Sequence, residues 1–326
     1  MKEIHQAESI PQEVIDIVNH DTFISSLPTT EELASVSGGV THLVYRITSE
    51  EDKYYLKIRK DRFVQIPEIT CNPADIAIEH RALTTFHQVS PENFPRVLSF
   101  NQDKFYMVLS DAIPNGEKLE TLFLEDEVTP RMLFNLGGTL RRIHDRSMTF
   151  TQGLRTDDDA ARYEELLEHR FGYRHHLVLD ELVDQLRKQG SRQLVLGDPS
   201  PKNIGANNDG ELFMFFDLET AHKGDTVFDY GYLLGHVAIH TFTSPATAVE
   251  AIKSYTKGYG EHTFNEETVK RIALGIMLYR LDSIIPYPLR LDTEERTRTQ
   301  QRIEEVLAYN LGYANWPEVI KMLQYE

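Results

Sequence analysis

The pattern of the sequence changes near residue 112, and this change limits the possible folds more than any other feature. Before it, there are three short runs rich in Val, Ile, Tyr and Thr within residues 33–60 and two more within residues 96–111. Polar turns separate these runs, as is typical of β-strands. After it, apolar residues recur mainly at helical spacing. We therefore expect an α+β chain in which residues 1–112 form a small lobe with a five-stranded antiparallel sheet and residues 113–326 form a larger, mainly helical lobe.

The small lobe also contains helical segments. Residues 10–20 have the pattern of a short N-terminal helix. A second helix is predicted over residues 74–88, after Asn72, a good N-cap, and Pro73, which suits a first helical turn. In this helix Glu79 falls on the same face as the apolar residues three or four positions away. We expect Glu79 to point inward, where a carboxylate requires a partner.

Charge and cysteine content exclude several classes of protein. The chain has 34 Lys and Arg against 51 Asp and Glu, a net charge of −17, which argues against a general binder of nucleic acid or anionic membranes. The N-terminus lacks the apolar core of a signal peptide, and no apolar stretch is long enough to span a membrane. The lone Cys71 excludes an intramolecular disulfide and any multi-cysteine zinc site. We expect a cytoplasmic protein.

The segment 194–219 carries the strongest chemical signal. An apolar run ends at Gly197-Asp198, Asn203 follows five residues later, and a hairpin that turns at Asp209-Gly210 leads to Asp217. This order predicts three side chains with oxygen atoms at loop ends on one side of a small sheet. Such oxygens suit Mg²⁺ together with phosphate, while a carboxylate that binds no metal accepts a proton from a hydroxyl nucleophile.

These residues resemble the catalytic region of the aminoglycoside phosphotransferase and choline kinase-like family of small-molecule kinases, which has a protein-kinase-like fold. The family pattern His-Gly-Asp-x-x-x-x-Asn, then Asp-x-Glu, is matched at 196–203 and 217–219, with Leu196 in place of the histidine. The resemblance implies that Asp198 is the catalytic base and that Asn203 and Asp217 bind Mg²⁺. It also implies that Asp229, in the following Gly-Asp-x-x-x-Asp segment, is structural and braces the catalytic loop. His144 is interpreted as structural too.

The small lobe supplies the other parts that such a kinase requires. Lys57 alternates with apolar residues on the third strand, and the inward-facing Glu79 is its expected partner. The paired Gly38 and Gly39 occupy the position of the phosphate-covering loop, although a plain hairpin turn is an equal alternative. The hydroxyls of Ser37 and Thr41 are further donors in this loop.

The resemblance also places the adenine site. It implies that backbone groups near residues 107–112 meet the adenine edge, so Met107 and Leu109 are expected at the nucleotide. The apolar candidates for the two sides of the ring are Val44, Leu56 and Met107. The alternative is that they belong to the ordinary core, and we expect some of them to do both.

The implied reaction transfers the γ-phosphoryl of ATP, or of GTP, to a hydroxyl of a small molecule. No pattern identifies the acceptor. The candidates for its site are Tyr163, His236, His240, Tyr279, Arg280, Asp282 and Tyr287. Asp282 and the acidic face of Glu164, Glu165 and Glu168 suit a cationic acceptor, whereas Arg280 suits an anionic or sugar-like one. For the three glutamates, a solvated charged helix face is the favoured interpretation.

Other functions remain open at this point. Sugar or amino-acid kinases of the methylthioribose, homoserine or fructosamine type share the expected architecture. A catalytically silent nucleotide-binding or scaffold protein is the alternative from another class, and a nucleic-acid-binding helical protein is disfavoured by the charge.

Overall fold

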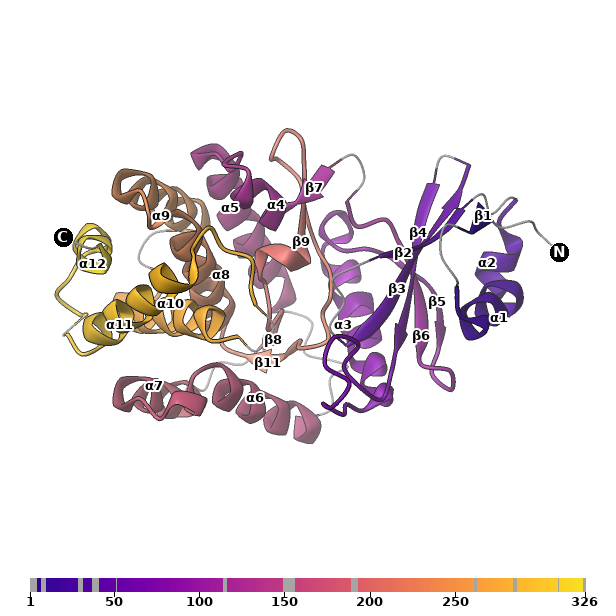
Figure 1. Ribbon diagram of the computed structural model, residues 1–326, viewed down its shortest axis with the longest axis horizontal. Coiled ribbons are helices and arrows are strands. Elements are labelled where there is room, and N and C mark those ends of the chain that lie inside the picture. The colour runs from indigo at the N-terminus through magenta and orange to yellow at the C-terminus, as the bar shows by residue number, and fades with distance from the viewer. Residues whose placement is uncertain are drawn as a thin grey trace. The chain divides into compact units, whose positions relative to one another are not determined.

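The computed structural model describes most of the chain, and the described residues divide into compact parts. They are residues 5–6, 10–28, 32–36, 41–50, 52–113, 116–148, 156–188, 193–260, 263–283, 286–309 and 311–324. One compact unit comprises Met1–Pro114 with Phe216–Glu219, and the other comprises Asn115–Phe215 with Thr220–Glu326. Each unit is described by itself, and Figure 1 shows the elements of both.

The first unit is built on a sheet with the strand order β1-β2-β3-β4-β6-β5. The five strands from β2 to β6 pair antiparallel, as the sequence predicts, and the α+β fold class with this sheet is confirmed. A two-residue strand, β1, extends one edge in parallel and was not expected. The strands are β1 (His5–Gln6), β2 (Glu32–Val36), β3 (His42–Ser49), β4 (Asp52–Arg59), β5 (Val97–Asn101) and β6 (Tyr106–Ser110).

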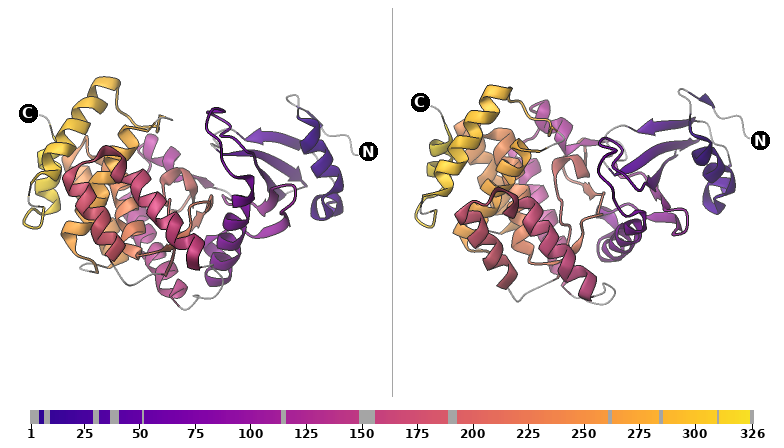
Figure 2. Two further views of the ribbon diagram at one scale, coloured as in Figure 1. Left: turned by 90° about the horizontal axis from the view of Figure 1, so that it is seen from below. Right: turned by 60° about the horizontal axis from the view of Figure 1, so that its bottom comes forward.

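Helices cover both faces of this sheet, as Figures 1 and 2 show. On one face lie α1 (Gln12–His20) and α2 (Thr22–Ser26), whose apolar side chains share a core with Leu56 and Ile58 of β4. On the other face lies α3 (Ile76–Val89), which follows a short 3₁₀ turn capped by the Asn72 side chain. Because side chains alternate along a strand, Lys57 points away from that core and toward α3.

The second unit contains two small β-ribbons. In one, β7 (Gly116–Lys118), β9 (Ile204–Asn207) and β10 (Phe213–Phe215) pair antiparallel, and in the other β8 (Gln193–Val195) pairs with β11 (His222–Gly224). Strand β7 is an addition to the elements that the sequence predicts. A Cβ atom at Gly116 would lie 2.0 Å from the Ala206 carbonyl oxygen, so the pairing depends on glycine.

Helices make up the rest of the second unit, as the sequence predicts. Helices α8 and α10 pack against each other, and α8 is buried along almost its whole length. The helices are α4 (Leu119–Leu124), α5 (Pro130–Ser147), α6 (Thr156–Arg170), α7 (Leu177–Lys188), α8 (Thr226–Thr241), α9 (Pro245–Tyr259), α10 (Glu266–Leu281), α11 (Thr293–Leu307) and α12 (Trp316–Leu323).

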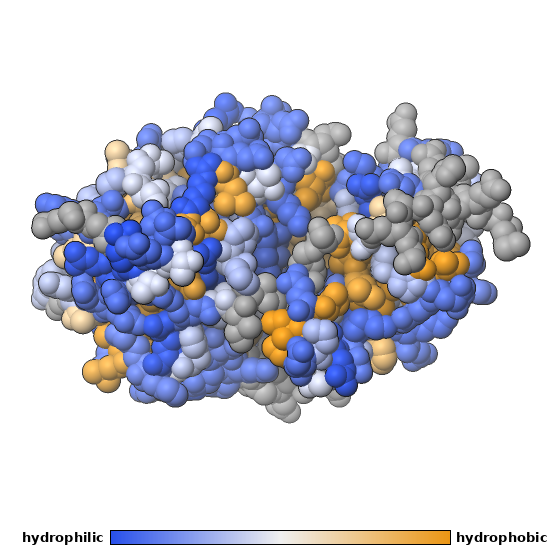
Figure 3. Space-filling view, viewed as in Figure 1, coloured by the Kyte–Doolittle hydropathy of each residue, from blue (hydrophilic) through white to orange (hydrophobic). Residues whose placement is uncertain are grey.

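The surface agrees with the charge of the sequence. Hydrophilic residues make up most of the face shown in Figure 3. Within the described ranges, no helix combines the length and the apolar character that crossing a membrane requires.

Candidate active site

Lys57 lies at the centre of a buried charge cluster in the first unit. Its Nζ donates to Glu79 Oε1 at 2.6 Å and to Asp217 Oδ1 at 2.5 Å. Lys57 is 7 % exposed and Glu79 is fully buried. The pairing of Lys57 with Glu79 that the sequence suggests is therefore present, and Asp217 joins it from a segment 160 residues further along the chain.

The pKa values of this cluster follow from burial and from the neighbouring charges. Burial lowers the pKa of Lys57, but the carboxylates of Asp217 and Glu79 outweigh it and raise that pKa above its ordinary value. Burial raises the pKa of Glu79, although Lys57 opposes this shift. Lys57 therefore stays charged at neutral pH, as a lysine that binds phosphate must.

The Asp217–Glu219 segment is fixed to the first unit at both ends. Arg59 Nη1 donates to Glu219 Oε2 at 2.5 Å, and Thr41 Oγ1 donates to the same atom at 2.9 Å. Asp217 has a backbone φ of 61°, in the left-handed region that non-glycine residues seldom adopt. Strained positions of this kind cluster at functional sites.

A set of possible metal ligands lies in the same cluster. His42, Glu79 and Asp217 bring ligand atoms within 4.8 Å of one another. The Lys57 ammonium already bridges the two carboxylates. Burial, with Lys57 and Arg59, also holds the pKa of His42 well below its usual value. Lys57 thus offsets part of the negative charge of the two carboxylates.

Strand register separates the residues expected at the adenine ring. Val44 and Met107 are the neighbours of Lys57 on the two adjacent strands, so they share its face of the sheet. Leu109 lies two residues along β6 on that face. Leu56 lies on the opposite face, in the core with α1 and α2, and its assignment to the ring is wrong because neighbours on a strand point to opposite sides.

The expected phosphate-covering glycines, Gly38 and Gly39, and the neighbouring Ser37 lie outside the described residues. Thr41 is described. Besides its bond to Glu219, it contacts His42 Nδ1 at 2.7 Å.

The catalytic loop of the second unit holds Asp198 and Asn203. Asn203 Nδ2 donates to the Asp198 carbonyl oxygen at 3.1 Å, so Oδ1 is the atom of this amide that a cation would contact. Gly197 has a φ of 79°, and a Cβ atom there would lie 2.2 Å from the Thr220 carbonyl oxygen. Only glycine fits this turn, which accounts for the Gly-Asp pair in the sequence.

Asp229, on α8, holds the catalytic loop through backbone hydrogen bonds. Its Oδ2 accepts from the N–H of Leu196 at 2.6 Å, and its Oδ1 accepts from the N–H of Gly197 at 2.9 Å. His144 Nε2 lies 3.2 Å from Oδ2, and His144 Nδ1 contacts the Tyr259 hydroxyl at 2.8 Å. Both side chains are buried, so Asp229 and His144 have the surroundings expected of structural residues.

Two arginines surround the Asp198 carboxylate. Arg280 Nη2 donates to Oδ1 at 3.0 Å, and Arg170 Nη2 lies 3.5 Å from Oδ2. Arg280 also donates to the Tyr232 hydroxyl at 2.6 Å and to His236 Nε2 at 3.1 Å. Burial alone raises the pKa of Asp198, but Arg280 and then Arg170 outweigh it, and this pKa lies well below its usual range.

The acceptor candidates divide into two groups. Arg280, His236, Tyr279 and Tyr287 lie together: the Arg280 guanidinium is 5.1 Å from the Tyr279 ring centre and 4.8 Å from that of Tyr287. His240 lies beside His236 and Tyr287.

The remaining candidates contact other residues. Tyr163 is a core residue, because it is 1 % exposed and its hydroxyl donates to the Leu186 carbonyl. Asp282 is paired with Arg174 and accepts from the Tyr173 hydroxyl. Of the acidic helix face, Glu164 and Glu168 pair with Arg187, and Glu165 is an exposed residue of the same helix.

Sequence reasoning missed several residues of both clusters. Arg170 of α6 lies close to Asp198, and Tyr232 of α8 contacts Arg280, which in turn contacts Asp198. These contacts form only because α6, α8 and the catalytic loop meet in the fold. His42 and Arg59 lie opposite each other on β3 and β4, two residues from Val44 and Lys57. Alternation along β4 places Arg59 on the same face of the sheet as Lys57, so the sequence pattern alone could have identified it.

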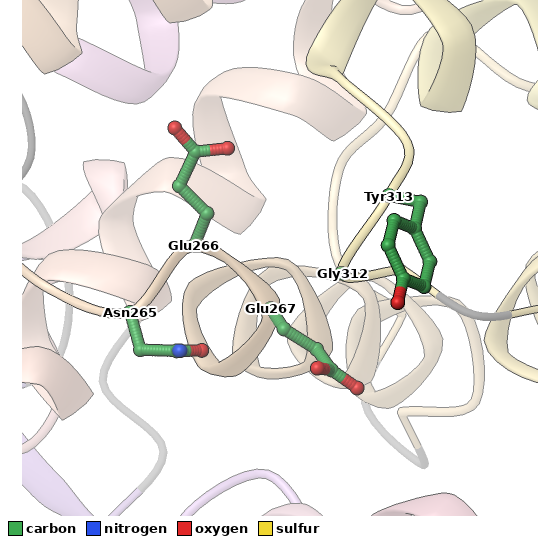
Figure 4. Close-up of a pocket in the computed structure, with 5 residues that line it drawn as sticks. All are labelled: Asn265, Glu266, Glu267, Gly312 and Tyr313. Carbon is green, nitrogen blue, oxygen red and sulfur yellow. The ribbon is translucent and has the colours of Figure 1, made fainter.

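A hollow at the start of α10 contains none of these residues. It is lined by Asn265, Glu266, Glu267, Gly312 and Tyr313. Figure 4 shows the carboxylates of Glu266 and Glu267 pointing in different directions, and they pair with Lys270 and Arg271 of the same helix. The hollow therefore offers no convergent binding groups.

Comparison with known proteins identifies the family. Residues 32–269 match the phosphotransferase enzyme family, and the chain belongs to it. No curated protein sequence matches the chain. The resemblance stated from the motifs is thus confirmed.

Solved structures of this group share the fold. A choline/ethanolamine kinase family protein from Mesorhizobium loti is 16 % identical, with a TM-score of 0.54, and the match covers 95 % of this chain and 99 % of that one. A spectinomycin phosphotransferase in complex with ADP and spectinomycin is 14 % identical, with a TM-score of 0.53 and coverage of 97 % and 98 %. The GDP complex of an aminoglycoside 2'-phosphotransferase is 13 % identical, with a TM-score of 0.55 and coverage of 96 % of both chains.

Proposed function

We propose that this phosphotransferase transfers the γ-phosphoryl group of ATP, or of GTP, to a hydroxyl of a small molecule. The observation that carries the proposal is the buried cluster in which Lys57 Nζ contacts both Glu79 and Asp217. A lysine held between two carboxylates keeps its charge and a fixed position, as phosphoryl transfer requires. The nucleotide complexes among the similar structures support a nucleotide donor.

Lys57 binds the phosphates of the nucleotide, and Glu79 orients Lys57. Asp198 positions the acceptor hydroxyl. In the transfer, the bond from the γ-phosphorus to the β–γ bridging oxygen breaks, and a bond to the acceptor oxygen forms. The acceptor proton passes to Asp198, and the nucleoside diphosphate leaves. Because the pKa of Asp198 is low, we expect proton transfer to come late and positioning to dominate its contribution.

Mg²⁺ fits the residues present, because Asn203 and Asp217 offer the hard oxygen atoms that this ion prefers. When bound, the ion neutralises negative charge on the β- and γ-phosphate oxygens. The contact of Asn203 Nδ2 with the Asp198 carbonyl directs its other amide atom, Oδ1, to this role. Asp217, which contacts Lys57, would be the other residue to hold the ion.

Sugar and amino-acid kinases of the methylthioribose, homoserine or fructosamine type are alternatives within the same proposal. A silent nucleotide-binding protein is disfavoured because Lys57, Asp198, Asn203 and Asp217 are all present. We further propose a cytoplasmic location, because the chain has a single cysteine.

A thermal-shift titration tests the nucleotide part of the proposal. Wild type, Lys57→Met and Asp217→Asn are heated with ATP or GTP, each with and without Mg²⁺. We expect a nucleotide-dependent rise in Tm for wild type that increases with Mg²⁺, a loss of the rise in Lys57→Met, and a loss of the Mg²⁺ increment alone in Asp217→Asn. Absence of any shift with both nucleotides in wild type would contradict the proposal.

A further inference from the structure

The surroundings of Asp198 hold more positive than negative charge. Within the described part of the chain, Asp198 is the one carboxylate that the guanidinium groups of Arg170 and Arg280 contact. Both arginines are 5 % exposed. A buried charge without a partner is costly, so two buried cations that share one anion leave a site for a second anion.

The neighbouring titratable groups do not remove this excess. Burial and Arg280 hold the pKa of His236 well below its usual value and that of His240 at about 3, so both imidazoles are neutral at pH 7. Lys202 adds a positive charge that acts on Asp198, and Glu120 adds a carboxyl group that Arg280 influences. Lys118 also acts on Glu120, so four cations stand against two carboxyl groups.

Unpartnered donors in the same cluster point to an anionic ligand. Arg170 Nε is buried and has no hydrogen-bond partner among the described residues. Arg280 Nε donates to His236 Nε2, so the neutral imidazole carries its hydrogen on Nδ1. That Nδ1–H is also buried and unpartnered in the described chain. An oxyanion is the ligand that accepts from such donors.

Aromatic rings fix the orientation of the guanidinium groups. The Arg170 guanidinium carbon lies 4.4 Å from the Tyr279 ring centre, and that of Arg280 lies 4.8 Å from the Tyr287 ring centre. Stacking holds both planar groups while their N–H edges remain directed outward from the rings. A fixed pair of this kind suits a planar carboxylate or a phosphate group.

We propose that the acceptor carries an oxyanion, either a carboxylate or a phosphate ester, close to the hydroxyl that receives the phosphoryl group, and that Arg170 and Arg280 bind it. This inference rests on the proposed function and adds the substrate class. The two arginines lie 3.5 Å and 3.0 Å from the Asp198 carboxylate that positions the hydroxyl. The anion and the hydroxyl are therefore only a few bonds apart, and a cationic amino alcohol is repelled.

A matched set of acceptors tests the inference. Glucuronate, glucose 6-phosphate, glucose and glucosamine share one scaffold and differ in charge, as do glycerate, glycerol 3-phosphate, glycerol and the amino diol serinol. Transfer from ATP and binding by calorimetry are measured for each compound. We expect the anionic members of at least one set to bind about 10- to 100-fold more tightly than the neutral member, by the strength of charge-assisted hydrogen bonds. The carboxylates and phosphates then distinguish the two sources of the oxyanion.

Variants at Arg170 assign the effect. In Arg170→Met we expect KM for the preferred anionic acceptor to rise about 10- to 100-fold, with KM for ATP unchanged. Arg170→Lys keeps the charge and serves as a control for effects of Arg170→Met on folding. We expect it to raise KM by a smaller factor, and only for anionic acceptors. The control Arg187→Met, on the exposed face of α7, leaves both values unchanged.

The outcomes separate this inference from the proposed function. Equal or weaker binding of the anions relative to the neutral compounds in both sets overturns the inference, even if transfer from ATP to a neutral or cationic compound supports the proposed function. Anion binding that depends on Arg170, without transfer from ATP to any acceptor, supports the anion site and contradicts the phosphotransferase assignment.

Discussion

Replacing Lys57 by Met isolates the energetics of the buried cluster. The substitution keeps an unbranched side chain of similar length but removes the charge that contacts Glu79, which is fully buried. Among the described residues the remaining carboxylate of Glu79 has no other close cation, since the His42 ring is 3.6 Å away and its pKa lies well below the usual value. Breaking a buried ion pair in this way costs about 3–5 kcal/mol.

The carboxyl group limits this cost by taking up a proton. Protonating a glutamate with an ordinary pKa of about 4.3 requires about 3.7 kcal/mol at pH 7 and about 1 kcal/mol at pH 5, at 1.36 kcal/mol per pH unit. Burial already raises the pKa of Glu79 in wild type, and the pKa lies higher still in the variant because Lys57 no longer opposes the shift. Near neutral pH the folded variant therefore binds more protons than folded wild type. The destabilisation relative to wild type is therefore largest at neutral pH and shrinks as the pH falls.

Chemical denaturation followed by circular dichroism at pH 7 and pH 5 measures these values. We expect Lys57→Met to lose about 3–5 kcal/mol at pH 7 and less at pH 5, because protonation of Glu79 relieves more of the cost at the lower pH. In Lys57→Met/Glu79→Gln the loss at pH 7 is largely restored, whereas phosphotransfer remains absent. A loss that is the same at both pH values, or a double variant as unstable as the single one, would refute the reasoning.

Three further predictions concern other contacts. Asp229→Asn replaces one of the two oxygens that accept from backbone N–H groups by an amide donor. We expect a loss of about 2–4 kcal/mol in unfolding free energy, measured by denaturation, and a fall in kcat, measured by steady-state assay. Unchanged values would contradict the bracing role of Asp229. The pKa of His236 is lowered in the folded protein, so below about pH 6.5 the unfolded state binds more protons and the free energy of unfolding falls as the pH falls. His236→Gln should reduce the loss of unfolding free energy between pH 7 and pH 5 by about 2 kcal/mol. An unchanged pH dependence would argue against this. Arg59→Met removes the hydrogen bond that Arg59 donates to Glu219. We expect KM for the nucleotide to rise with little change in KM for the acceptor. A rise in KM for the acceptor alone would contradict a role of Arg59 in nucleotide binding.

Local patterns explain which parts of the site could be predicted. Strand alternation and helical spacing are sufficient to turn Lys57 and Glu79 toward the same interior, and the structure brings them to 2.6 Å. The same alternation places Leu56 on the opposite face, so the sequence pattern alone was enough to exclude Leu56 from the adenine ring. The extra strand β7 depends on a close approach at Gly116 that the sequence shows only as a turn residue.

Contacts between distant helices could not be predicted in the same way. Arg170 lies in a highly charged helix that suggests a solvated face, and it approaches Asp198 only through the packing of the second unit. Arg280 contacts Asp198 across 82 residues of sequence. No local periodicity encodes such a pair, so its consequence for the acceptor comes from the structure alone.

Transfer of label from [γ-³²P]ATP to an acceptor, compared between wild type and Asp198→Asn, tests the central claim most directly. The substituted side chain keeps its size and can still contact Arg280, but it cannot accept the hydroxyl proton. We expect wild type to form labelled product in the presence of Mg²⁺ and Asp198→Asn to lose at least about 100-fold in kcat, with an unchanged nucleotide-dependent rise in Tm. Labelled product at the wild-type rate from Asp198→Asn would contradict the account.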